Sequence, residues 1–141
     1  MATVPFVQFN CFAQNLGDGV HDLNTDTLAI YLSDTAPNVA TAAVKADVPE
    51  IATGHGYGGP VGIDNLYSQT SGVGILTSAS NKIITAAGGS IGPFRYVVLC
   101  NTSKSGSPLI AYYDYGSEVT LLDTQSFRVN FGANVLTIPH S

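Results

Sequence analysis

Residues 88–115 read GGSIGPFRYVVLCNTSKSGSPLIAYYDY and predict, in order, a glycine–proline turn, a strand, a polar loop and a second strand. The run at 94–100 is almost entirely apolar, which is typical of a strand buried on both faces. The next strand, at 108–115, ends in a cluster of tyrosines. Two successive strands of this kind indicate a fold built around a β-sheet.

A two-residue rhythm occurs again at 27–33, where Leu28, Ile30 and Leu32 share one predicted face and Tyr31 lies on the other. The pattern predicts a mainly β fold: a single-domain β-sandwich or barrel over residues 1–141, with about seven to eight short strands and one N-terminal α-helix. Further strands are predicted at 61–70, 72–77, 82–87, 127–131 and 135–138.

The N-terminal helix is predicted over residues 5–23, because apolar residues recur there at spacings of three and four. His21 falls at its end, where a positive charge is favourable. Residues 39–60 fit neither the helical nor the strand period and predict a long surface loop or arm, a kind of segment that often binds partners. The helical apolar positions are Phe9, Phe12, Ala13, Leu16, Val20 and Leu23.

The composition restricts the class of function. Charged residues make up only 11% of the 141 residues, against about 25% in ordinary soluble proteins, which favours a chain that hides part of its surface against a partner. The net charge is −5 and the five cationic residues are scattered, so no nucleic-acid partner is expected. No apolar run is long enough for a membrane span, and the N-terminus lacks the features of a signal peptide. No membrane partner and production in a cytoplasm are expected.

Reactive chemistry is not predicted. The histidines His21, His55 and His140 lack the spacing of a zinc site, and the glycine-rich stretch 54–60 lacks the lysine that ends a phosphate-binding loop. Cys11 and Cys100 are expected to be reduced thiols, with Cys11 exposed or at a subunit contact. We therefore expect no catalytic residue, no metal and no cofactor, and we expect that the chain is not an enzyme.

Aromatic residues are the better candidates for a functional surface. Tyr112, Tyr113 and Tyr115 place rings on both faces of one predicted strand, so at least one of them should point away from the core. Tyrosine is enriched at protein interfaces because it buries a large ring and keeps a hydrogen-bonded hydroxyl. His55 and Tyr57, in the long loop, complete the candidate interface. The alternative is that all three strand tyrosines pack under loops.

Several segments, in this order along nearly the whole chain, resemble a family of small virion proteins encoded by tailed bacteriophages. The first is GVHDL at 19–23, followed by DTAPN at 34–38 and EIATGHGY at 50–57. The later ones are GGSIGPFRY at 88–96 and PLIAYYDYG at 108–116.

The resemblance implies a structural component, and most directly a capsid decoration or cement protein that stabilises the lattice of the major capsid protein. The implied partners are the major capsid protein and further copies of the chain, as a homodimer or homotrimer. The implied location is the outer surface of the capsid, after synthesis in the cytoplasm of the host bacterium. An acidic chain also suits the outer surface better than the DNA-facing interior.

Two alternatives stay open. One is a tail or fibre component with a receptor-binding or carbohydrate-binding β-domain. The other is a small hydrolase or lyase built on a β-barrel, which would need a pocket where polar groups converge.

Overall fold

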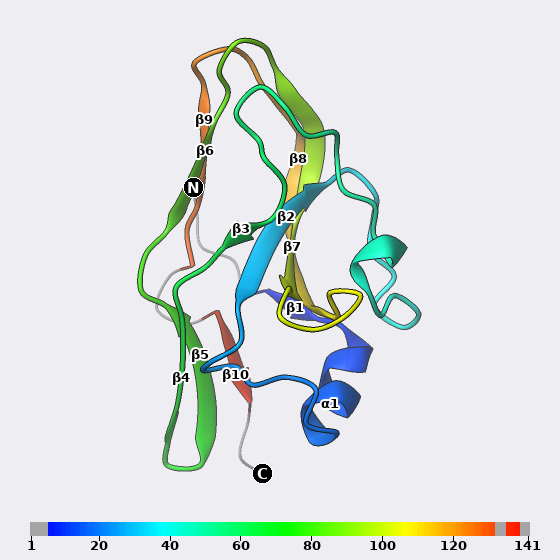
Figure 1. The fold of residues 1–141 in the computed structure, drawn as a ribbon, viewed down its shortest axis with the longest axis vertical. Coiled ribbons are helices and arrows are strands. Elements are labelled where there is room, and N and C mark those ends of the chain that lie inside the picture. The colour runs from blue at the N-terminus through cyan, green and yellow to red at the C-terminus, as the bar shows by residue number, and fades with distance from the viewer. Residues whose placement is uncertain (1–5, 132–134, 139–141) are drawn as a thin grey trace.

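The computed structural model describes residues 6–131 and 135–138, and its architecture is mainly β with one helix near the N-terminus (Figure 1). The predicted fold class is confirmed: antiparallel sheets pack as a small β-sandwich-like domain. The strands are β1 Val7–Gln8, β2 Leu28–Ser33, β3 Val61–Gly62, β4 Asn65–Thr70, β5 Val73–Ser78, β6 Lys82–Thr85, β7 Ile91–Asn101, β8 Leu109–Leu121, β9 Ser126–Val129 and β10 Leu136–Ile138.

The largest sheet has five strands in the order β1-β8-β7-β2-β3, and all its pairs are antiparallel. In its central strands, Tyr31 of β2 pairs with Val98 of β7, and Val98 pairs in turn with Tyr112 of β8. The predicted strands at 94–100 and 108–115 are β7 and β8, and they pair with each other. β8 runs beyond its predicted end to Leu121, with an irregular register around Gly116, where φ is +97°.

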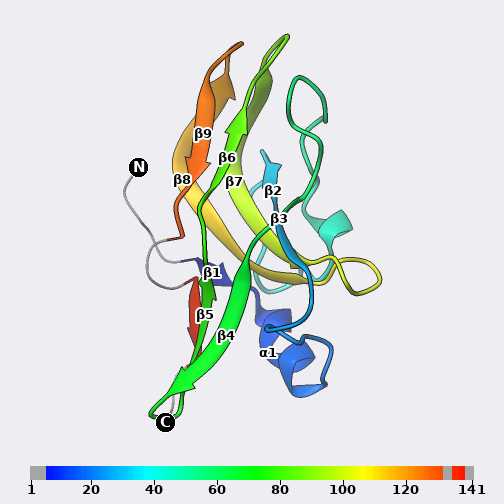
Figure 2. The same ribbon diagram turned by 60° about the vertical axis from the view of Figure 1, so that its left-hand side comes forward.

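Two smaller sheets, β10-β5-β4 and β6-β9, complete the fold. The hairpin of β4 and β5 extends to one end of the molecule and the β6–β9 pair to the opposite end (Figures 1 and 2). The hairpin turns through Ser71 and Gly72, both with positive φ, as a two-residue type I′ turn requires. The single strand predicted at 61–70 is wrong: its first part, β3, pairs with β2, and the rest, β4, pairs with β5.

The core lies on both faces of the five-stranded sheet. Leu28, Ile30 and Leu32 face the main cluster, which also receives Leu76 and Phe127 from the small sheets. The opposite face is covered by the chain from 39 to 48. There Tyr31 packs in a second cluster with Val98, Ala42 and Val48. The alternation predicted from the sequence is confirmed, and every residue of β2 is buried because both faces are covered.

The helix is shorter than predicted. It is α1, Asn10–Gly17, rather than residues 5–23, and residue 5 lies outside the described residues. The backbone leaves the helix after Gly17, the amide of Val20 reaches back to the carbonyl of Asn15 at 2.9 Å, and Gly19 has a φ of +76°. Glycine in a helix costs conformational free energy, so the helix ends at Gly17 although the apolar period continues to Leu23.

The long loop at 39–60 contains one 3₁₀ turn, Lys45–Asp47, and several contacts fix it to the sheet edge. The hydroxyl of Tyr31 donates to the carbonyl of Val48 at 2.8 Å, and the hydroxyl of Ser33 donates to the carbonyl of Pro49 at 2.6 Å. Among the described residues, no helix is both long and apolar enough to cross a membrane.

Candidate interaction surface and buried polar network

The three tyrosines of β8 have different surroundings. Tyr112 is half-buried, with its ring 5.6 Å from that of Phe9, whereas Tyr113 is buried in the main core cluster. Tyr115 is 38% exposed and packs edge-on against Phe127, with ring centroids 5.4 Å apart. The interface assignment of Tyr113 is therefore wrong, because its side chain packs in the core, with its ring 6.0 Å from that of Phe6. Tyr115 is the tyrosine of the cluster that reaches the surface.

Tyr57 is also a core residue, so its assignment to an interface is wrong. Its side chain is 1% exposed, its hydroxyl accepts the backbone N–H of Leu32 at 3.0 Å, and it donates to the carboxylate of Glu50. Burial raises the pKa of Tyr57, so the phenol stays protonated. His55 is exposed, as the interface assignment requires.

The glycines around His55 serve close backbone contact. A Cβ atom on Gly56, where φ is +99°, would lie 2.2 Å from the carbonyl oxygen of Thr85. A Cβ on Gly89 would lie 2.4 Å from Nδ1 of His55. The carbonyl of His55 accepts the amide of Ala87 at 2.8 Å, which holds the loop against the end of β6. The prediction that the glycines of 54–60 serve backbone geometry agrees with the positive φ of Gly54, Gly56 and Gly59, but Gly58 has neither a positive φ nor a close neighbour.

Both cysteines are free thiols. Cys100 is fully buried, and this burial raises its pKa to about 12. Cys11 is half-buried, with its sulfur directed to the carbonyls of Leu109 and Ala43, and burial raises its pKa as well. A high pKa keeps each thiol protonated and poorly nucleophilic. Within residues 6–131 and 135–138, no group of three or more His, Cys, Asp or Glu side chains could hold a metal ion.

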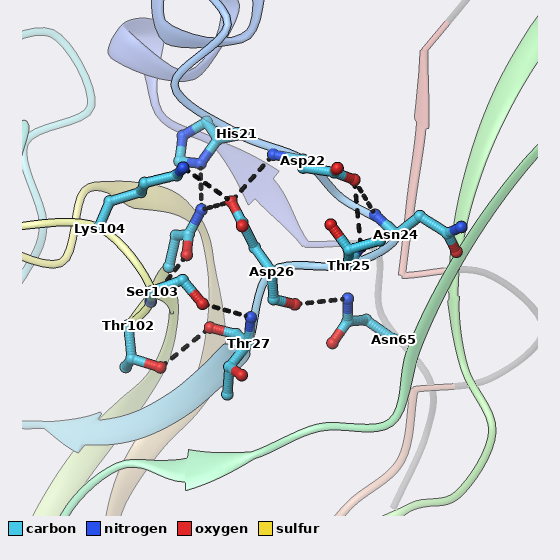
Figure 3. A network of polar contacts seen from close by, with 11 residues as sticks. His21, Asp22, Asn24, Thr25, Asp26, Thr27, Asn65, Thr102, Ser103 and Lys104 are labelled. Atoms are coloured by element: carbon cyan, nitrogen blue, oxygen red, sulfur yellow. Dashed lines mark hydrogen bonds and ion pairs between the residues drawn. The ribbon is translucent and has the colours of Figure 1, made fainter.

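A buried polar network connects the segment after α1 to the β7–β8 loop (Figure 3). Its centre is Asn101, the fully buried last residue of β7. The amide nitrogen of Asn101 lies 2.7 Å from Oδ2 of Asp26 and 3.0 Å from Nδ1 of His21. Its amide oxygen accepts the backbone N–H of Ser103 at 3.0 Å. All these contacts place the NH₂ group on the side of His21 and Asp26.

Asp26 receives donors from three directions. Besides the Asn101 amide, the backbone N–H of Asp22 donates to its Oδ2 at 3.0 Å, and Nζ of Lys104 lies 3.9 Å from the same oxygen. The hydrogen bonds from Asp22 and Asn101 lower the pKa of Asp26. This carboxylate therefore stays ionised and organises the segment around it.

The remaining contacts stabilise the turn of this segment and attach it to the β7–β8 loop and to β4 (Figure 3). The carboxylate of Asp22 caps the turn by accepting the backbone N–H groups of Asn24 and Thr25, both at 3.1 Å. The backbone N–H of Thr27 donates to the hydroxyl of Ser103 at 2.7 Å. The side-chain amide of Asn65, at the start of β4, donates to the carbonyl of Asp26 at 3.1 Å.

His21 is 6% exposed, and burial lowers its pKa from the usual 6.5. The sequence-based expectation of a favourable positive charge at a helix end is therefore wrong, since α1 has already ended at Gly17. Its Nδ1 accepts from Asn101, so the neutral ring carries its proton on Nε2, and this buried Nε2 has no hydrogen-bond partner within the described part of the chain. His140 lies outside the described residues.

A pocket of about 500 Å³ lies beside this network, between the end of α1 and β4. Its wall combines apolar side chains with polar groups of the 19–24 turn, and Tyr67 closes it on the β4 side. The amide of Tyr67 donates to Oδ1 of Asn24 at 3.3 Å, which joins the two walls. The lining residues are Leu16, Gly19, His21, Asp22, Leu23, Asn24 and Tyr67.

Exposed apolar side chains occur on the small sheets and near the strand ends. Leu66 on β4 is 57% exposed, and Leu122 after β8 is 58% exposed. The chain between Asp64 and Lys82, which forms the β4–β5 hairpin, contains no charged residue. Edge strands are ordinarily protected by charges, so this uncharged hairpin is the best candidate for an interaction surface. Among the described residues, the other exposed large apolar side chains are Val7, Ile83 and Tyr115.

Comparison of the chain with protein-family models, with curated proteins and with solved structures finds no match. Sequence reasoning did not find the uncharged hairpin as a surface, although the absence of charge over these residues is visible in the sequence. It also missed the network around Asn101. This residue is 75 positions from Asp26 and 80 positions from His21 along the chain, so no local sequence pattern indicates their contact.

Proposed function

We propose that this chain is a structural protein of a tailed-bacteriophage virion, a decoration protein that binds and stabilises the lattice of the major capsid protein. The uncharged β4–β5 hairpin, which extends from one end of the molecule and exposes Leu66, carries this proposal (Figure 1). A protein that stabilises a lattice by binding to it needs a rigid fold and a binding surface that is easily desolvated. Few charges at the contact lower the desolvation cost.

The resemblance of the segments at 19–23, 34–38, 50–57, 88–96 and 108–116 to small phage virion proteins supports the same class of function. The location on the outer capsid surface and the assembly into a homodimer or homotrimer remain predictions. Many weak contacts around a shell would add to a firm attachment through avidity.

The number of copies in purified particles tests the proposal. We expect the copy number of this chain to be close to that of the major capsid protein, because a decoration protein occupies every equivalent lattice site. Quantitative densitometry of purified particles measures the ratio, and a cryo-electron microscopy reconstruction locates the density. Absence of the chain from purified particles would contradict the proposal.

The second candidate, a tail or fibre component with a receptor- or carbohydrate-binding domain, is favoured by one observation. The pocket beside β4 is lined by apolar residues, such as Leu16 and Leu23, and by polar ones, such as Asn24 and Asp22. This candidate predicts a few copies per particle, located in the tail. The same densitometry and reconstruction therefore separate the two candidates.

A further inference from the structure

The buried contact between His21 and Asn101 depends on the protonation state of the imidazole. The orientation of the Asn101 amide is fixed from both ends: Ser103 donates to its oxygen at 3.0 Å, and Asp26 accepts from its nitrogen at 2.7 Å. The group that faces Nδ1 of His21 at 3.0 Å is therefore an NH₂ donor. Nδ1 can accept this hydrogen bond only while it carries no proton.

Protonation of His21 places an N–H group against the NH₂ group of Asn101. Two donors at this distance repel, and the amide cannot rotate to present its oxygen without losing the bonds from Ser103 and to Asp26. The Nε2–H of His21 is already buried without a partner among the described residues, so the added charge gains no second acceptor. The folded arrangement thus accepts only the neutral ring.

The charged groups around His21 are Asp26, on the same segment, and Lys104, from the β7–β8 loop. Asp26 favours a cation, but its Oδ2 is already engaged with the Asp22 amide, Asn101 and Lys104. The Lys104 ammonium opposes a second positive charge. The ring of Phe12 from α1 lies 5.5 Å away and offers no charge. Asp22 lines the same pocket as His21, and its carboxylate accepts the backbone N–H groups of Asn24 and Thr25. Burial is the largest influence, and it lowers the pKa of His21.

We propose that protonation of His21 releases the segment 18–27 from the loop 101–104 and so makes this end of the molecule sensitive to mild acid. The segment also forms much of the wall of the pocket beside β4, so its release changes that surface. The five-stranded sheet is held by its own ladder and keeps its structure. The local opening is the pH-dependent step.

The direction of the pH dependence follows from the lowered pKa. Below the ordinary histidine value of about 6.5, the opened segment binds a proton that the closed segment excludes. The closed state is therefore fully stable at pH 7 and loses stability as the pH falls below 6.5. One such proton changes the opening equilibrium by at most about tenfold per pH unit.

Nuclear magnetic resonance of the histidine nitrogens tests the geometry directly in the unmodified chain. We expect the neutral Nε2–H form for His21 and a pKa below the usual histidine value. Either the Nδ1–H form or a pKa at or above 6.5 would overturn the proposal, because both would mean that His21 donates from Nδ1 or pairs as a cation with Asp26.

Hydrogen exchange tests the release. Between pH 7 and pH 5.5 the protection factors of the Asp22 and Thr27 amides, corrected for intrinsic rates, should fall by about tenfold. The Tyr31 amide, in the middle of the β2–β7 pair, should keep its protection. An equal loss of protection at Tyr31 would indicate global acid unfolding and would overturn the proposal.

The variant His21→Gln isolates the titrating group. A glutamine oxygen can accept from Asn101 and carries no titratable proton, so the difference between pH 7 and pH 5.5 should disappear. The matched control is His55→Gln, which removes an exposed histidine and should leave the acid response unchanged. An unchanged acid response in His21→Gln would overturn the proposal. These measurements use the free chain, so their outcome is independent of the proposed role in a virion.

Discussion

At the scale of single residues, the hydroxyl of Tyr57 accepts a backbone hydrogen bond from β2 that a neighbouring β-strand would otherwise accept. The N–H of Leu32 finds its acceptor in the hydroxyl of Tyr57 at 3.0 Å, and this hydroxyl donates onward to Glu50. Glu50 also pairs with Lys45 at 2.7 Å. A buried backbone donor needs a partner, and a side chain from the long loop supplies it.

Replacement of Tyr57 by phenylalanine tests this contact. Tyr57→Phe keeps the ring but leaves the buried N–H of Leu32 without its acceptor, so we expect the free energy of unfolding to fall by about 1–3 kcal/mol. Urea unfolding measures the change. The control is Tyr115→Phe at a surface position, where we expect a change within about 0.5 kcal/mol. Equal effects of the two substitutions would contradict the assigned role.

At the scale of elements, the glycine-rich stretch 54–60 acts as a close-packed connection. Gly56 has a φ of +99° and lies against the backbone of Thr85, so no side chain fits between the loop and the end of β6. Gly58, two residues later, has open space around its Cα. The two glycines lie in the same glycine-rich stretch, but only Gly56 is in close contact with another part of the backbone.

The pair of substitutions Gly56→Ala and Gly58→Ala measures this difference. In Gly56→Ala the Cβ collides with a carbonyl oxygen and the backbone is strained, so we expect a loss of at least about 2 kcal/mol in the free energy of unfolding. In Gly58→Ala we expect a change of no more than about 0.5 kcal/mol. Thermal and urea unfolding of both variants provide the comparison. A similar change in unfolding free energy at both positions would mean that the 54–60 loop can move away from Thr85 without loss of stability.

At the scale of the whole molecule, apolar side chains remain exposed at both ends. Leu66 and Leu122 are almost equally exposed, at 57% and 58%, but only Leu66 belongs to the uncharged hairpin. The two leucines therefore form a matched pair. They distinguish a specific contact surface from general surface hydrophobicity.

Substitution of each leucine by aspartate tests the hairpin as the contact surface. We expect Leu66→Asp to weaken binding to capsids that lack the protein by about 10- to 100-fold, because a leucine buried in a contact contributes about 1.5–3 kcal/mol. Leu122→Asp should bind within about twofold of the unmodified chain. Co-sedimentation with such capsids measures binding, and circular dichroism confirms that both variants fold. Loss of binding in Leu122→Asp alone would place the contact at the opposite end.

The sequence by itself determined the mainly β fold and the two central strands, because alternation along β2 and the apolar run of β7 are local patterns that directly reflect burial. It also indicated that the glycines near His55 serve backbone geometry, which agrees with the close approach of Gly56 but not with the open space at Gly58. The extent of the helix was predicted incorrectly, since the apolar period continues past Gly17 where the backbone does not. Periodicity reports which side chains are buried and not which conformation buries them.

Only the tertiary structure decided the roles of the polar and aromatic residues. Tyr57 and Tyr113 are buried because distant segments cover them. Burial lowers the pKa of His21, and Asn101, 80 residues later, donates to its Nδ1. The reason is physical: a buried polar group needs a partner, and here that partner comes from another part of the chain. The local sequence indicates which side chains tend to be buried. The hydrogen-bond partner of a buried polar side chain is decided only when the sheets pack together.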